Sequence, residues 1–153
     1  MSPVEEGIIR RKLAVIVECL NALDPIKGMT MEDYLGDLYK RKAAERLMQE
    51  MIEAAIDINT HIIVHAGNTP PEDYYESFIK LGELKVISKI LAEKLAPSAG
   101  LRNRLVHEYD TLKDPIVLEA IGTAEELYPE YIKEIEGYIS GGSERATSPG
   151  RQA

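Results

Sequence analysis

Apolar residues recur every three or four positions in the first part of the chain, which is the spacing of an amphipathic helix. From Val4 onward they stand at Ile9, Leu13, Ile16, Leu20 and Leu23. The pair Asp24-Pro25 follows directly. Because proline lacks the amide hydrogen that continues the backbone ladder, this pair predicts the end of the first helix.

A longer pattern of the same period begins near Thr30, a residue type that commonly caps helix N-termini. Its apolar positions are Leu38, Leu47, Met51, Ala54, Ile58 and Ile62. Gly67 and the Pro70-Pro71 pair mark its end. The sequence therefore predicts one long helix over this whole stretch.

Two further patterns complete the predicted fold. One runs from about Pro71 to Leu95 and is closed by Pro97; the other starts at Asp114-Pro115, a strong helix-start signal. Pro129 should kink or interrupt this last helix. Four main apolar stripes, one short segment between the third and fourth, and no strand pattern predict an all-α, up-and-down helical bundle of four main helices plus a short helix.

Length and composition fit a single folded domain, since the chain has 153 residues, of which 44% are hydrophobic and 29% charged. We assign that domain to residues 1–139. Residues 140–153 are rich in Gly and Ser and have no period, so they predict a flexible C-terminal tail. No apolar run is long enough to cross a bilayer, and we expect a cytoplasmic protein without membrane association.

Charge and cysteine content restrict the chemistry. The formal net charge of −8 weighs against broad, charge-driven binding to nucleic acid, so an RNA substrate would need a local basic cleft. Cys19 is the only cysteine, which excludes an internal disulfide, and its apolar neighbours indicate a buried thiol without a catalytic role.

The short segment from Ala99 to Asp110 predicts a helix of about three turns with varied polar chemistry. On such a helix Arg102 and Tyr109 share one face with the apolar Val106, and Asn103 and His107 lie beside it. Leu101 and Leu105 fall on another arc, where they can anchor the helix in the core. The functional and packing faces are therefore predicted to be separate.

Arg102 and His107 are five residues apart, which places them about 140° apart around a helix. This is too far for a compact site in one copy of the chain unless the long arginine reaches round. Two copies facing each other would bring the groups together and would also cover Val106. The pattern thus predicts a homodimer through the motif-bearing face.

The run from Leu101 to Tyr109 resembles a known motif. Arg102, four residues, His107, one residue and Tyr109 match the Arg-x4-His-x-Tyr motif of HepT-like toxins, within the HEPN superfamily, and Asn103 fits the polar position that follows the arginine. Residues 54–58 are also similar to the family's long helix, and the resemblance covers roughly residues 4–139.

The resemblance implies the toxin of a type VII-like toxin–antitoxin pair, a homodimer that cuts RNA in a shared cleft without a metal or cofactor. Arg102 would hold a phosphate, and His107 would move a proton at the ribose 2′-hydroxyl or at the leaving oxygen. Asn103 would orient His107 or the phosphate. Tyr109 would receive AMP from an MNT-type nucleotidyltransferase antitoxin, forming an O-AMP-tyrosine that obstructs the cleft.

Other interpretations remain open at this stage. The chain could be a non-catalytic substrate-binding or docking subunit of a nucleotidyltransferase, with Tyr109 only packing at an interface, or a structural adaptor. His61 and His65 have a spacing that could share a metal, but no third ligand is evident, so we predict no metal site. Asp57 could hold the His61 ring, and Glu53 is interpreted as a solvated surface residue.

Overall fold

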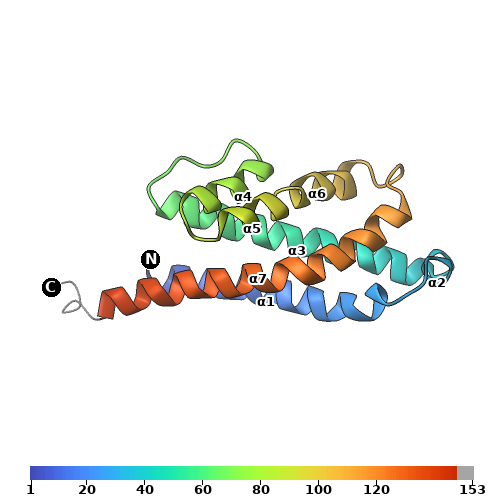
Figure 1. The fold of residues 1–153 in the computed structure, drawn as a ribbon, viewed down its shortest axis with the longest axis horizontal. Helices are drawn as coiled ribbons and strands as arrows, with labels where there is room; N and C mark the ends of the chain where they lie inside the picture. The colour runs from blue at the N-terminus through green and yellow to red at the C-terminus, as the bar shows by residue number, and fades with distance from the viewer. Residues whose placement is uncertain (148–153) are drawn as a thin grey trace.

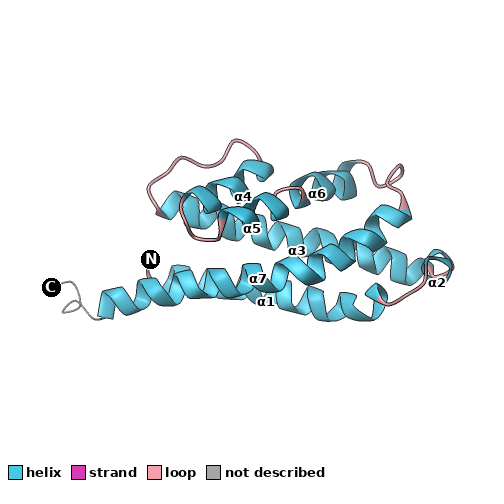
Figure 2. Cartoon of the chain, in the orientation of Figure 1, coloured by secondary structure: helices cyan, strands magenta, loops and turns pink. Residues whose placement is uncertain are grey.

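The computed structural model describes residues 1–147, whose backbone forms helices joined by loops with no strand in that range (Figures 1 and 2). In chain order the helices are α1 (Pro3–Lys27), α2 (Met31–Leu35), α3 (Leu38–His65), α4 (Tyr74–Glu83), α5 (Lys89–Leu95), α6 (Ser98–His107) and α7 (Asp114–Thr147). The all-α fold class is confirmed.

The three longest helices, α1, α3 and α7, run side by side along the long axis of the molecule (Figure 1). The shorter helices α4, α5 and α6 lie together along α3, on the side away from α1. The short α2 lies at the end where the chain passes from α1 to α3. Helix α3 is therefore the centre of the bundle, because it packs against α1, α4, α6 and α7.

The prediction of one long helix from Thr30 onward is wrong, because the structure has two helices there, α2 and α3. Thr30 caps α2 through its hydroxyl, which accepts a hydrogen bond from the Asp33 amide at 3.1 Å. The chain leaves helical geometry at Asp37, which is extended and caps α3 by accepting from the Lys40 amide at 3.0 Å. Two N-caps so close together start two helices with different axes.

The predicted third helix is also divided, at Lys85. This residue has a φ of 61°, and the amides of Lys85 and Val86 donate to the carbonyls of Gly82 and Leu81. These two bonds form a Schellman motif, which ends α4. A Cβ on Gly82 would lie 2.8 Å from the Cβ of Ala92, so the glycine allows α4 and α5 to pack closely after the turn.

Neither internal proline ends its helix. Pro25 lies inside α1, which continues to Lys27, so the predicted end at Asp24-Pro25 is wrong. Ile26, the next residue, is 4% exposed, and its burial favours the extra turn despite the lost hydrogen bond. Pro129 lies on the exposed side of α7 between the buried Tyr128 and Tyr131, and the helix continues through it.

The last helix extends into the segment assigned to the tail. Helix α7 reaches Thr147, so residue 139 is not a structural boundary. Extending an existing helix adds one hydrogen bond per residue fixed, which costs less than starting a new one. The part of the predicted tail over residues 148–153 lies outside the described residues, and its flexibility stays a prediction. Within residues 1–147, no helix is both long and apolar enough to span a membrane.

Candidate active site

The motif lies on α6, which is shorter than predicted. The helix begins at Ser98 and ends at His107, so Tyr109 and Asp110 lie in the turn that follows. The amides of Thr111 and Leu112 both donate to the Glu108 carbonyl at 3.0 Å, which closes this turn. Only residues 108–113 connect α6 to α7, so the chain must change direction directly after His107. The predicted helical face shared by Arg102 and Tyr109 is therefore wrong.

Arg102 is fixed on three sides. Its Nε lies 3.4 Å from Oε1 of Glu53 on α3, an ion pair whose geometry is not that of a hydrogen bond. Its guanidinium carbon lies 5.0 Å from the centre of the Tyr74 ring, the first residue of α4, in a cation–π contact. Nη1 also donates to Oδ1 of Asn103 at 3.3 Å. The side chain is 18% exposed, so part of it remains accessible to solvent.

His107 has a different environment at the other end of the motif. It is the last residue of α6, is exposed, and has no hydrogen bond or ion pair with any residue of the described chain. Asn103 contacts Arg102 rather than His107. Because α6 is continuous between Arg102 and His107, the angular separation expected from the sequence applies. The imidazole is therefore open to solvent.

Tyr109 is 63% exposed, and it lies in the turn between α6 and α7. An exposed phenol on a short turn can be reached by the active site of another protein more easily than one on a packed helix face. This position is compatible with the modification that the motif implies.

Two residues of the site were not predicted from the sequence. Glu53 was interpreted as a solvated surface residue, but its carboxylate lies beside Arg102 and also accepts a hydrogen bond from Gln49 at 2.9 Å. Tyr74 was assigned only to an apolar stripe. Both are far from Arg102 along the chain, and no local spacing signals contacts of this kind.

The histidines of α3 lie near this cluster. The rings of His61 and His65 are 4.5 Å apart, and Nε2 of His65 lies 3.1 Å from Oε1 of Glu5. The interpretation of Asp57 as the partner of His61 is wrong, because Asp57 pairs with Lys12 of α1 at 2.9 Å. Among the described residues, no group of three His, Cys, Asp or Glu side chains is arranged to hold a metal ion.

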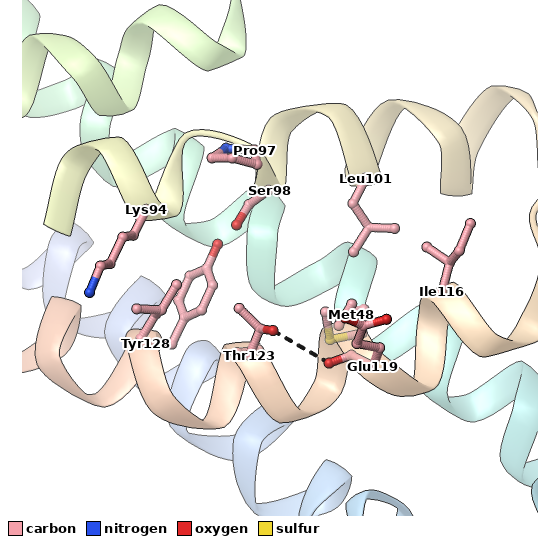
Figure 3. A pocket seen from close by; sticks show the side chains of 12 residues that line it. Met48, Lys94, Pro97, Ser98, Leu101, Ile116, Glu119, Thr123 and Tyr128 are labelled. Atoms are coloured by element: carbon pink, nitrogen blue, oxygen red, sulfur yellow. Dashed lines mark hydrogen bonds between the residues drawn. The ribbon is translucent and has the colours of Figure 1, made fainter. Parts of the chain in front are cut away.

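The opposite side of α6 faces a mostly apolar pocket of about 320 Å³ between α3, α6 and α7 (Figure 3). Leu101 of α6 points into it toward Met48, and the hydroxyls of Ser98 and Tyr128 face each other across it. Burial raises the pKa of Tyr128 well above its usual value. As expected, the packing residues of α6, including the buried Leu105, are separate from its polar face.

An all-α bundle that carries an Arg-x4-His motif on a short helix against its central helix defines a HEPN-type protein. The sequence matches the family described as Ribonuclease HepT-like over residues 9–137. This chain belongs to that family.

Two proteins named as nucleases are similar to the chain. The tRNA nuclease HepT of Aphanizomenon flos-aquae is 38% identical over 139 residues, which cover 91% of this chain and 95% of the relative. The mRNA nuclease HepT of Shewanella oneidensis is 28% identical over 129 residues, covering 84% and 96%. The matches extend well beyond the motif in both cases.

Solved structures share the fold. The tri-AMPylated HEPN toxin of Shewanella oneidensis, in complex with its MNT antitoxin, superposes with a TM-score of 0.77 at 27% identity, covering 90% of this chain and 99% of the toxin. A toxin–antitoxin complex with AMP-PNP gives a TM-score of 0.78 at 27% identity and covers 86% and 98%.

Proposed function

We propose that this protein is the toxin of a toxin–antitoxin pair, a metal-independent endoribonuclease whose catalytic residues are Arg102 and His107. The observation that carries the proposal is the contrast within α6: Arg102 is fixed by Glu53 and Tyr74, whereas the His107 ring is unpaired in the described chain. In phosphodiester cleavage a fixed cation can stabilise the charge of the transition state, and a free imidazole can transfer a proton. The nuclease names of two relatives support the same reaction.

In the proposed reaction the ribose 2′-oxygen attacks the adjacent phosphorus and the bond to the 5′-oxygen of the next nucleotide breaks. One His107 takes the 2′-hydroxyl proton, and a second His107 gives a proton to the leaving oxygen. Arg102 stabilises the charge on the non-bridging oxygens. The products are a 2′,3′-cyclic phosphate and a 5′-hydroxyl, and no water is consumed.

This scheme needs two copies of the chain. On one continuous helix Arg102 and His107 point about 140° apart, so one copy does not surround a phosphate with both groups. We propose a homodimer in which the two α6 helices face each other and each contributes its motif. Val106, which is partly exposed in the single chain, would then lie at the interface.

We further propose that an MNT-type nucleotidyltransferase neutralises the toxin through Tyr109. The phenolic oxygen would attack the α-phosphorus of ATP, forming O-AMP-tyrosine and releasing pyrophosphate. The 63% exposure of Tyr109 allows this reaction, and the structure of the similar Shewanella toxin is a tri-AMPylated one in complex with an MNT antitoxin. A bulky anion two residues from His107 would repel an RNA phosphate from the cleft.

The test is cleavage of total RNA by the purified protein in EDTA, with wild type beside His107→Ala. We expect cleavage by the wild type, loss of about 100- to 10,000-fold in the variant, and fragments that end in 2′,3′-cyclic phosphates. A 2′-deoxy substitution at the cleaved position should block the cut. Cleavage that persists in His107→Ala would refute the site, and a strict requirement for a divalent cation would refute metal independence.

A non-catalytic docking subunit is the second candidate function, and the net charge of −8 favours it over a nuclease. RNA cleavage and intact mass, measured on the same protein sample, distinguish the toxin from the docking subunit. Protein made together with its nucleotidyltransferase should gain AMP-sized mass at Tyr109 in either case. Only a toxin should lose RNA cleavage when that mass is gained.

A further inference from the structure

A groove of about 470 Å³ lies next to the Arg102 cluster, along one side of α3. Its walls come from Ile56, Asp57, Thr60, His61, Val64 and His65 of α3 and from Tyr74 of α4. The lining combines aliphatic side chains, three aromatic rings and a few polar groups. This composition is that of a small-molecule or nucleobase site rather than of a phosphate site.

Tyr74 connects the groove to the proposed catalytic site. Its ring lies under the Arg102 guanidinium, 5.0 Å from the guanidinium carbon, and it also lines the groove. The side chain is 41% exposed, so part of it is available to a ligand. A nucleotide whose phosphate contacts Arg102 would therefore have a neighbouring base within reach of Tyr74.

The groove also contains a polar atom without a partner. Nε2 of His61 is buried and makes no hydrogen bond to any described residue, although the His61 ring packs against His65. Buried polar atoms are rarely left unpaired, and a turn of the His61 ring toward the groove that its residue lines would let this covered nitrogen meet a partner there. The nitrogens and oxygens on the edge of a nucleobase can supply one.

The charges of the groove argue against a phosphate as the occupant. Asp57 lines the groove and is paired with Lys12, and His65 is paired with Glu5. The lining residues therefore carry a carboxylate and no lysine or arginine. A neutral base with N–H groups on its edge suits these acceptors better than an anion does.

We propose that this groove binds a base of the RNA substrate next to the cleaved phosphate, with Tyr74 as the stacking surface and His61 as a hydrogen-bonding group. The inference rests on the proposed ribonuclease function and makes Tyr74 and His61 determinants of which sequence is cut. Asp57 would favour bases that present N–H groups. Arg102 and His107 would act on the phosphate whatever base is bound.

The test compares cleavage positions on a random-sequence RNA, read from the fragment ends, for Tyr74→Ala, Tyr74→Phe and His61→Phe. Tyr75→Ala is the matched control, because Tyr75 is the next residue, is 48% exposed and does not line the groove. We expect Tyr74→Ala to lower kcat/KM roughly 5- to 150-fold and to weaken the base preference, as expected for one lost stack. Tyr74→Phe should retain both.

His61→Phe separates base recognition from the positioning of Arg102, which His61 does not contact in the described structure. It should change the base preference and lower kcat/KM on the preferred RNA more than on the other sequences. Unchanged preference in both His61→Phe and Tyr74→Ala would overturn the inference, as would an equal effect of Tyr75→Ala. Dissociation of the dimer in size-exclusion chromatography, accounting for the whole loss, would also overturn it.

Binding without cleavage gives an independent measurement. The chain has three histidines, so His107→Ala leaves only His61 and His65 as imidazole signals in the NMR spectrum. Titration with the four 5′-mononucleotides should shift the His61 signal, more with one base than with the others. Absence of any shift at millimolar nucleotide would refute the groove site, whereas failure of wild-type protein to cut RNA would refute only the ribonuclease proposal.

Discussion

Two polar clusters contact α3, and they differ in whether their hydrogen bonds are complete. In the buried cluster, Asn59 and Ser77 are both 0% exposed, and the Asn59 amide donates to the Ser77 hydroxyl at 3.2 Å. Ser77 donates in turn to the Tyr74 carbonyl at 2.7 Å. The hydroxyl of Tyr131 points at Oδ1 of Asn59 and at the Ala55 carbonyl, sharing its one proton between them.

In the second cluster, around Arg102, polar groups are left available. The His107 side chain has no partner within the described chain, and Tyr74 is 41% exposed. A buried polar group that is fully paired stabilises the fold, whereas one with free valences is available to a ligand. The two clusters meet at Tyr74, whose backbone belongs to the first and whose ring belongs to the second.

Among the variants that compare the two clusters, Arg102→Lys should have the largest effect. Lysine keeps the charge but loses the planar fork and the stacking surface on Tyr74, so we expect RNA cleavage to fall about 100-fold, equivalent to roughly 3 kcal/mol. The free energy of unfolding should fall by no more than about 1 kcal/mol, because lysine keeps the charge beside Glu53 and only the cation–π contact is weakened. Single-turnover cleavage and urea denaturation measure the two quantities. Arg104→Lys on the same helix is the control, and a fully active Arg102→Lys would show that the second cluster is not catalytic.

Asn59→Ala should have the opposite effect: it should lower the stability and leave RNA cleavage almost unchanged. It removes one of two hydrogen-bond partners from both Tyr131 and Ser77 and leaves a cavity in a fully buried site, and we expect a loss of about 2–3 kcal/mol in the free energy of unfolding. Urea denaturation measures this loss, and cleavage per folded molecule should stay within about threefold of the wild type. The exposed Asn103→Ala should cost less than about 0.5 kcal/mol. Stability unchanged in Asn59→Ala would remove the distinction between the clusters.

The sequence predicted the apolar part of this architecture well, because helical period reports burial directly. The positions Ile9, Leu13 and Ile16 of the first stripe are all buried in the core. The sequence did not predict that the third helix is divided at Lys85, because a lysine with positive φ stands where a glycine usually signals a helix end. Backbone hydrogen bonds to Gly82 and Leu81 stabilise that turn, and local residue preference does not reveal them.

The motif was recognisable from the sequence, but its surroundings were not. Arg102 and His107 lie on one helix and are visible as a spacing, whereas Glu53 meets Arg102 only because α6 packs on α3. Asn59 and Tyr131 are likewise brought together by packing, from positions 72 residues apart. The sequence thus identifies groups that share an element, and the fold is needed to show which groups hold them in place.

Two tyrosines on α7 allow a matched test of the buried cluster. Tyr128 and Tyr131 are 1% and 0% exposed and their rings lie 5.9 Å apart. The Tyr131 hydroxyl is hydrogen-bonded to Asn59 and Ala55, whereas the Tyr128 hydroxyl faces that of Ser98 outside hydrogen-bond geometry. Tyr131→Phe should lower the free energy of unfolding by about 1–2 kcal/mol, and Tyr128→Phe should be neutral or slightly stabilising. Thermal and urea unfolding of both variants measure the difference. Equal losses would mean that burial of the rings, and not pairing of the hydroxyl, sets the stability.

The smallest effect concerns the pH dependence of stability, to which the buried free thiol of Cys19 contributes. Burial, helped by Glu50 and Glu18, raises the pKa of its thiol to about 11, from 9.0. Below pH 9 the thiol is neutral in both states, but above it the unfolded chain ionises first, so stability should fall as pH rises from 9 toward 11, by on the order of 1 kcal/mol at pH 10. Cys19→Ala should flatten this fall in Tm between pH 8 and 10. Measurement below pH 10 limits the contribution of Tyr34, whose pKa burial raises to about 12. An identical pH profile in Cys19→Ala would place the alkaline sensitivity elsewhere in the core.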